Sequence, residues 1–171
     1  MSDNAIHLLF SSNRWESAPA ILKHLESGTT VICDRYAYSG VAFTSAKNNP
    51  AAPYEWCKSP DAGLPLPDAV VFLTVSEDVQ ALRGGMGEER YETTELQRSV
   101  RGTFKRLQDD DENVRPWTVV DADGTVEEVT EKVGRVVMDA VERVRRENPT
   151  VKKLWMEGDC GGGVGMKATL E

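Results

Sequence analysis

The stretch Val31-Ile32-Cys33-Asp34-Arg35-Tyr36 decides the fold class, because an apolar run ends abruptly in an acid, a base and an aromatic residue. The composition of residues 29–33 predicts a short strand buried inside a parallel sheet. Ligands of open parallel sheets bind beyond the carboxyl ends of the strands, where Asp34 and Arg35 would then lie. A carboxylate there can hold a metal-bound water, and a guanidinium suits a phosphate. An ordinary Asp–Arg surface ion pair is the alternative that the spacing leaves open.

Helices and strands alternate on both sides of this stretch. Apolar runs over 69–75 and 117–121 predict two further buried strands. Apolar spacing and capping residues predict helices over about 1–16, 17–28, 36–47, 76–83, 94–108 and 126–144, the last with a valine-rich buried stripe. The acidic run at 109–112 is most simply a solvated turn. The alternation predicts an α/β fold with a mainly parallel sheet flanked by helices.

The length of 171 residues allows one domain with a sizeable core. We predict a single domain over 1–148. Beyond it we predict a C-terminal tail over 149–171, disordered beyond about 157, because helical periodicity is lost there and glycines accumulate.

Charge and composition exclude several partners. The net charge of −8 disfavours non-specific binding to nucleic acids and anionic membranes. Three cysteines without metal-ligand spacing are typical of a reducing compartment. No signal peptide and no apolar run of roughly 18 residues is visible. We therefore expect no nucleic-acid or membrane partner and a cytoplasmic location, with the nucleus as the alternative.

Three ordered motifs carry a resemblance to a known family. They are HLLFSSNRWE at 7–16, DRYAYSGVAF at 34–43 and GEERYE at 87–92. Over residues 6–155 the chain resembles the thymidylate kinases, most closely the eukaryotic ones, which transfer a phosphoryl group from ATP to dTMP. The resemblance implies a P-loop NTPase-like fold, a nucleoside monophosphate kinase domain, ATP and Mg²⁺ as donor and cofactor, and a homodimer.

The resemblance also implies an acceptor site for dTMP. Phe10 matches the aromatic residue that stacks on thymine, and Arg14, one turn along the same helix face, matches the contact to the base edge. From spacing alone Phe10 would be a core residue. Tyr91 matches the aromatic that crowds the sugar 2′ position, with a contact between lid and helix as the alternative. The matched dTMP residues are Phe10, Arg14, Arg35, Ser39, Gly40, Phe43, Tyr91 and Gln97.

Catalytic and donor-site residues follow from the same resemblance. Asp34, Arg35 and Arg90 match catalytic positions, and Asp34 supports the metal through a water. Arg83 and Arg90 match the region where the lid meets ATP, although Arg83 could instead stack on adenine. The segment Asp121-Ala122-Asp123 matches the loop that borders adenine, with a generic strand-to-helix turn as an equal alternative.

One expected element has no counterpart in the sequence. The P-loop motif Gly-x-x-x-x-Gly-Lys-Ser/Thr, whose backbone amides and lysine cradle the donor phosphates, does not occur. We therefore expect the domain to be N-terminally incomplete, without its first strand or strands and its P-loop, and these 171 residues to be inactive alone. A non-catalytic nucleotide-binding or regulatory remnant is the alternative, and a deoxyribonucleoside kinase is a weaker one.

Overall fold

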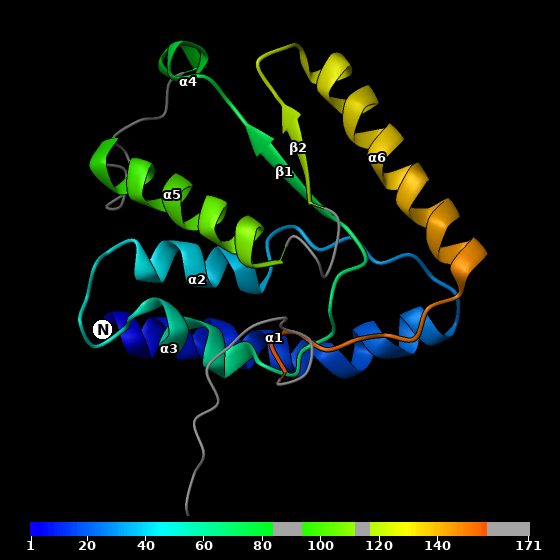
Figure 1. Ribbon diagram of the computed structural model, residues 1–171, viewed down its shortest axis with the longest axis horizontal. Helices are drawn as coiled ribbons and strands as arrows, with labels where there is room; N and C mark the ends of the chain where they lie inside the picture. The colour runs from blue at the N-terminus through cyan, green and yellow to red at the C-terminus, as the bar shows by residue number, and fades with distance from the viewer. Residues whose placement is uncertain (84–93, 112–116, 157–171) are drawn as a thin grey trace, which may run out of the picture.

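The computed structural model describes residues 1–83, 94–111 and 117–156 (Figure 1). The described elements are, in chain order, α1 (Asp3–Glu26), α2 (Ala37–Ser45), α3 (Tyr54–Lys58), the 3₁₀-helix η1 (Ser59–Asp61), β1 (Val70–Thr74), α4 (Glu77–Arg83), α5 (Thr94–Asp111), β2 (Trp117–Asp121) and α6 (Val126–Glu147). Within these residues no helix is both long and apolar enough to cross a membrane.

The sheet of the described residues consists of β1 and β2. The two strands are parallel, in a register that pairs Val70 with Trp117 and Thr74 with Asp121. Figure 1 shows α5 and α6 on opposite sides of these strands. On the α5 side the rings of Phe72 and Phe104 lie 4.9 Å apart. The predicted parallel sheet flanked by helices is therefore confirmed.

The predicted strand over 29–33 is wrong. These residues form neither a helix nor a strand, and Ile32 is 78% exposed. A strand exists only through ladder hydrogen bonds to a neighbour, and no strand among the described residues lies beside this segment. Residues 31–33 are apolar, as the prediction of a buried strand requires. An apolar composition alone does not provide the neighbouring strand with which they would pair.

The first two predicted helices are one continuous helix, α1, which has Pro19 in its interior. Proline removes one backbone hydrogen bond, which made a break near residue 17 plausible. However, the buried residues His7, Ser11 and Ala18 lie on both sides of that position and keep one face packed. Tertiary packing of this face therefore outweighs the local cost of the proline.

Helix α5 runs to Asp111, so the prediction of a solvated turn at 109–112 is wrong for the residues described. The hydroxyl of Tyr54 donates to Asp110 at 2.6 Å, and Lys58 Nζ lies 3.8 Å from the same carboxylate. Asp111 is only 4% exposed. These contacts hold the acidic turn in the helix.

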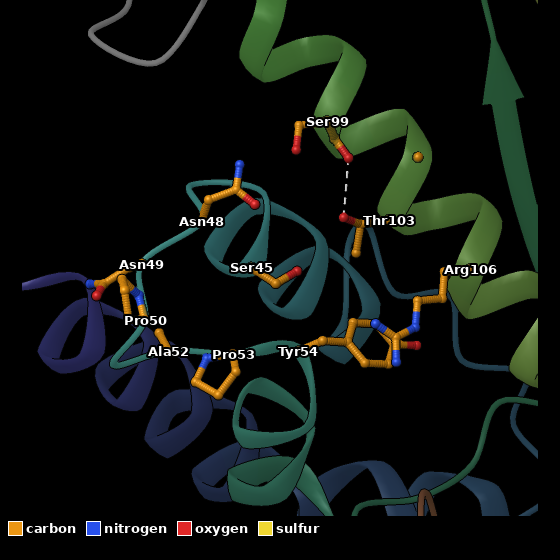
Figure 2. Close-up of a pocket in the computed structure, with 11 residues that line it drawn as sticks. Ser45, Asn48, Asn49, Pro50, Ala52, Pro53, Tyr54, Ser99, Thr103 and Arg106 are labelled. Carbon is orange, nitrogen blue, oxygen red and sulfur yellow. Dashed lines mark hydrogen bonds between the residues drawn. The ribbon is translucent and has the colours of Figure 1, made fainter.

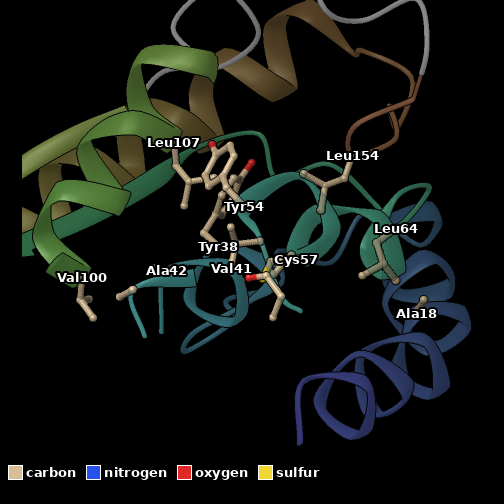
Figure 3. Packing of buried hydrophobic residues seen from close by; sticks show 13 residues of the cluster. Ala18, Tyr38, Val41, Ala42, Tyr54, Cys57, Leu64, Val100, Leu107 and Leu154 are labelled. Carbon is tan, nitrogen blue, oxygen red and sulfur yellow. The ribbon is translucent and has the colours of Figure 1, made fainter. Parts of the chain in front are cut away.

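The hydrophobic core lies in a helical layer formed by α1, α2, α3, η1 and α5 (Figure 3). Its most deeply buried apolar side chains include Val41 of α2, Leu107 of α5 and Leu64. Helix α6, in contrast, has no buried residue. The predicted buried stripe of α6 is therefore only half-buried, and its first residue, Val126, is 78% exposed.

A segment that follows α6, residues 150–156, completes this core, and we call it the C-terminal strap. It returns along α1 in Figure 1 and pairs with residues 63–66. Gly63 N donates to Leu154 O and Leu154 N donates to Leu64 O, both at 2.8 Å. Leu154 is fully buried. The tail predicted beyond about 157 lies outside the described residues.

Candidate functional site

Polar residues on one face of α1 hold this helix against its neighbours, and His7 is the first of them. His7 Nε2 lies 2.9 Å from the carbonyl oxygen of Cys57, and Nδ1 lies 2.9 Å from Thr44 Oγ1. Because a carbonyl only accepts, Nε2 carries the proton and Thr44 donates to Nδ1. Burial lowers the pKa of His7, which keeps the imidazole neutral. His7 therefore links α1 to both α2 and α3.

Arg14 lies two turns further along the same face and is bound by Asp61 of η1. Nε and Nη2 of Arg14 donate to Oδ1 and Oδ2 of Asp61 at 3.0 and 2.6 Å. Ser11 Oγ lies 2.7 Å from Oδ1 of the same carboxylate. Asp61 is fully buried, whereas the Arg14 side chain is 12% exposed. This two-point contact fixes the plane of the guanidinium.

Gly40 of α2 lies against the Arg14 guanidinium. A Cβ atom at Gly40 would lie 3.0 Å from Nη2 and 3.4 Å from Nη1 of Arg14. The absence of a side chain at Gly40 therefore makes room for the arginine. Two residues predicted for one site, Arg14 and Gly40, are thus brought together.

Arg35 and Phe43 form a second predicted pair. The guanidinium carbon of Arg35 lies 5.4 Å from the centre of the Phe43 ring, within the range of a cation–π contact. Arg35 has φ 62°, a left-handed conformation that is uncommon outside glycine. The neighbouring Tyr36 donates its hydroxyl to Pro65 O at 3.1 Å, and burial raises its pKa well above the usual range. Tyr36 therefore anchors the turn that carries Arg35.

The remaining residues predicted to bind dTMP lie at the surface or are partly buried, where the structure describes them. Phe10 is 62% exposed and borders an open hollow of about 440 Å³ with Ile6, Leu9 and Asn13. The prediction of Phe10 as a core residue from spacing alone is therefore wrong. Ser39 of α2 and Gln97 of α5 are half-buried. Tyr91 and Arg90 lie outside the described residues.

The predicted donor-side residues gather at the carboxyl end of the sheet. Arg83 Nη2 donates to the carbonyl oxygens of Asp123 and Gly124 at 3.2 and 2.8 Å. The carboxylate of Asp123 accepts the Ser76 N–H at 2.7 Å, and this hydrogen bond lowers its pKa. Ala122, between the two predicted aspartates, is buried and donates its N–H to Thr74 O at 2.8 Å. Arg83 and residues 121–123 therefore form one cluster, separate from Arg14.

The residues present do not form a magnesium site. Asp34 is exposed, and the described part of the chain contains no group of three or more His, Cys, Asp or Glu side chains placed to hold a metal ion. Magnesium prefers an octahedral shell of oxygens, of which a single carboxylate supplies little. The role predicted for Asp34 consequently depends on ligands beyond those described.

A larger cavity of about 580 Å³ opens between α5 and the loop that follows α2 (Figure 2). Arg106 and Tyr54 line it, and the guanidinium carbon of Arg106 lies 3.6 Å from the Tyr54 ring centre. Ser45, Ser99 and Thr103 donate their hydroxyls to main-chain oxygens of Val41, Ala46 and Ser99. None of the predicted site residues lines this cavity.

Comparison with known proteins identifies the family. The family model described as thymidylate kinase matches residues 1–133. The chain belongs to the thymidylate kinase family. The predicted resemblance is therefore confirmed, and the named relatives are kinases, which are transferases.

Individual thymidylate kinases align over most of the chain. The proteins from Danio rerio and Homo sapiens are 46% and 43% identical over 155 residues, which cover 91% of this chain and 70% of each relative. The protein from Arabidopsis thaliana is 43% identical, and the aligned part is 56% of its length. The chain thus spans between about half and about two thirds of these relatives.

A solved thymidylate kinase supports the fold. The structure of the enzyme from Candida albicans superposes with a TM-score of 0.72 at 33% identity, covering 90% of this chain and 74% of that one. The P-loop NTPase-like fold class predicted from the sequence is confirmed.

Sequence reasoning missed the buried polar residues that fix Arg14 and hold α1 against its neighbours. Asp61, Ser11 and His7 make buried polar contacts between α1 and its neighbours, and the sequence predicted no role for any of them. Asp61 lies 47 residues from Arg14. The only available signal was a carboxylate within the short Ser59-Pro60-Asp61 segment, which gives no indication of an arginine partner.

Proposed function

We propose that this chain provides the dTMP-binding side of a thymidylate kinase, the enzyme that transfers a phosphoryl group from ATP to dTMP to give dTDP and ADP. The observation that carries the proposal is the Arg14 guanidinium, held by Asp61 and lying against Gly40. A fixed planar donor suits the polar edge of a base. Exposed Phe10, on the same helix, offers an aromatic surface of the kind that stacks on bases.

Each acceptor residue has a separate role in this proposal. Arg14 donates to the thymine edge, Phe10 stacks on the ring, and Arg35 binds the acceptor phosphate as a charge that no carboxylate among the described residues neutralises. Ser39 and Phe43 line the pocket, and Gln97 approaches it from α5. Tyr91 would exclude ribonucleotides, and Arg90 would act on the transferred phosphoryl group.

For the ATP-binding side we propose which residues border the nucleotide, without assigning individual contacts. Arg83 and residues 121–123 would border the adenine of ATP, consistent with their clustering beside the end of β2. Magnesium would supply positive charge at the phosphates, but the described residues do not form its site, and no step is assigned to it. Because these 171 residues contain no P-loop motif, we propose that by themselves they bind dTMP without measurable turnover.

Calorimetric titration with dTMP and dAMP tests the proposal. We expect saturable dTMP binding at one site and much weaker binding of dAMP, because the purine does not fit a pyrimidine pocket. Absence of dTMP binding, or equal affinity for both nucleotides, would contradict the acceptor-site proposal.

A coupled ADP-release assay tests turnover separately. With dTMP and ATP we expect no activity above a blank prepared from the same host. ADP production that Arg35→Ala abolishes would overturn the proposed inactivity and leave the family role intact.

The absent P-loop motif also favours a second candidate function, a non-catalytic nucleotide-binding or regulatory protein. This candidate predicts that addition of the chain to an active thymidylate kinase changes that enzyme's rate at fixed dTMP. If the only effect is sequestration of dTMP, the regulatory form of this candidate is excluded. Phosphorylation of thymidine rather than dTMP would instead favour a deoxyribonucleoside kinase.

We further propose that two copies of the chain associate. Leu8 and Leu9 of α1 are 47% and 59% exposed, and paired exposed leucines on one helix are often covered by a partner. Sedimentation equilibrium should give a dimer for the unmodified chain and a monomer for Leu8→Lys. A monomer at all concentrations would contradict this proposal.

A further inference from the structure

Asp61 combines complete burial with a strong charged contact. Both of its carboxylate oxygens receive hydrogen bonds from Arg14, and Ser11 donates to one of them. A buried carboxylate without such partners would cost several kcal/mol. Asp61 is thus paired with two side chains of α1, Arg14 and Ser11, rather than with solvent.

The Asp61 contact uses only one edge of the guanidinium. A guanidinium has five N–H groups, and Asp61 receives one from Nε and one from Nη2. Nη1 has no partner among the described residues. A donor edge that is fixed in direction and still unused is the feature that base recognition needs.

The charge of the pair also limits what Arg14 can bind. The positive charge of Arg14 is matched at 2.6 Å by Asp61. This pairing weakens the attraction of Arg14 for an anion such as phosphate while leaving its N–H groups available for a neutral acceptor. Arg35 lies over the Phe43 ring and forms no ion pair with a carboxylate of the described residues, so it has no such counter-charge. The two arginines are therefore suited to different parts of one nucleotide.

Gly40 restricts the guanidinium at a further point. A Cβ atom there would come within 3.0 Å of Nη2, the same nitrogen that donates to Asp61 at 2.6 Å. Any side chain at position 40 would therefore push against a group that Asp61 holds in place. The position of Arg14 depends on both residues.

We propose that Asp61 and Gly40 are positioning residues for Arg14 that set the preference for a pyrimidine with a carbonyl group at its edge over one with an amino group. This inference rests on the proposed function, because it assumes that Arg14 faces the acceptor base. A fixed N–H donor gains a hydrogen bond from the carbonyl oxygen of thymine. The same donor meets an N–H group at position 4 of 5-methylcytosine, and the two donors cannot pair.

The test is the ratio of the dissociation constants of 5-methyl-dCMP and dTMP. These ligands differ at position 4, which bears an amino group or a carbonyl group, and at N3, which carries a hydrogen only in thymine. We expect the unmodified chain to prefer dTMP by about 10-fold or more. Asp61→Asn places an N–H group against Arg14 and should reduce this ratio by about 10-fold, mainly through weaker dTMP binding. Both ligands are measured on the same protein, so any loss of folded protein cancels in the ratio.

Gly40→Ala provides a second variant that leaves Asp61 intact. The added methyl group should displace the guanidinium and reduce the ratio in the same direction, by less than Asp61→Asn does. Gly134→Ala of α6 is the matched control, because a Cβ atom there meets nothing within 4 Å. The ratio for Gly134→Ala should equal that of the unmodified chain. If Asp61→Asn does not fold, Gly40→Ala decides the test.

Three results would overturn the inference, and they can be told apart. If the unmodified chain does not bind dTMP, the proposed function fails together with the inference. If it binds dTMP and 5-methyl-dCMP equally, dTMP binding stands and the proposed preference for a carbonyl edge fails. If Asp61→Asn lowers the ratio further in a chain that already carries Arg14→Met, Asp61 does not act through Arg14.

Discussion

The helical layer and the sheet region of this protein differ in how completely their own residues bury them. In the helical layer His7, Asp61, Leu64 and Leu154 are each at most 1% exposed. On the sheet side, Leu73 of β1 and Val119 of β2 remain 50% and 48% exposed. Helix α6, which packs beside β2, has no buried residue.

This difference shows where a binding site can be preorganised. Charged and polar groups keep a fixed geometry when packing excludes alternative rotamers, and the helical layer does this for Arg14 through buried Asp61. On the sheet side, Arg83 contacts exposed loop carbonyls instead. We therefore expect the acceptor half to be the more rigid and the more sensitive to substitution.

The largest predicted effect concerns the C-terminal strap. Leu154→Ala removes a fully buried side chain and should lower the free energy of unfolding by about 2–5 kcal/mol. Met138→Ala on α6, where the side chain is 54% exposed, should cost much less. Urea denaturation measures both. Similar losses for the two variants would remove the distinction between the regions.

A smaller effect is predicted for His7 and depends on pH. His7→Gln should lower the free energy of unfolding at pH 8 by about 1–3 kcal/mol, because two buried hydrogen bonds are lost. The lowered pKa of His7 stabilises the fold fully above the unfolded value of 6.5, and this contribution is lost as the pH falls through the folded pKa. Stability should thus decrease on acidification below pH 6.5.

The control for this pH dependence is the exposed His24 on the same helix. His24→Gln should keep the slope of stability between pH 8 and pH 5, whereas His7→Gln should flatten it. If both variants keep the full slope, His7 does not cause it.

The smallest effect is predicted on α6. Arg135 and Glu131 form an exposed ion pair at 3.2 Å, with side chains 69% and 73% exposed. Arg135→Ala should change the free energy of unfolding by no more than about 0.5 kcal/mol. A loss comparable to that of His7→Gln would mean that α6 is stabilised in a way that its exposure does not reveal.

Sequence reasoning predicted those parts of the fold whose signal is local. Strand β2 was predicted residue for residue at 117–121, and α5 and α6 begin at or beside their predicted first residues. Each has a continuous apolar run or a helical period, and α6 begins at a capping box formed by Thr125 and Glu128. Such signals need no knowledge of distant residues.

Features that depend on distant partners could not be predicted. The run at 29–33 has the composition of a strand but lacks a neighbouring strand among the described residues. Arg14 was identified through the family motif, whereas its partner Asp61 lies in a short 3₁₀ turn without periodicity. The strap was not predicted to pack, because residues 150–156 show no helical or strand period, and their apolar residues Val151 and 154–156 do not indicate the distant segment 63–66 with which they pair.

We propose that the helical layer, rather than the sheet region, recognises dTMP. Calorimetric titration of dTMP into the unmodified chain, Arg14→Ala and Arg83→Ala tests it most directly. We expect Arg14→Ala to weaken dTMP binding by about 10-fold or more, since a hydrogen bond from a charged group is lost. Arg83→Ala should change dTMP binding by no more than about twofold. Equal losses for the two variants, or a larger loss for Arg83→Ala, would contradict recognition of dTMP by the helical layer.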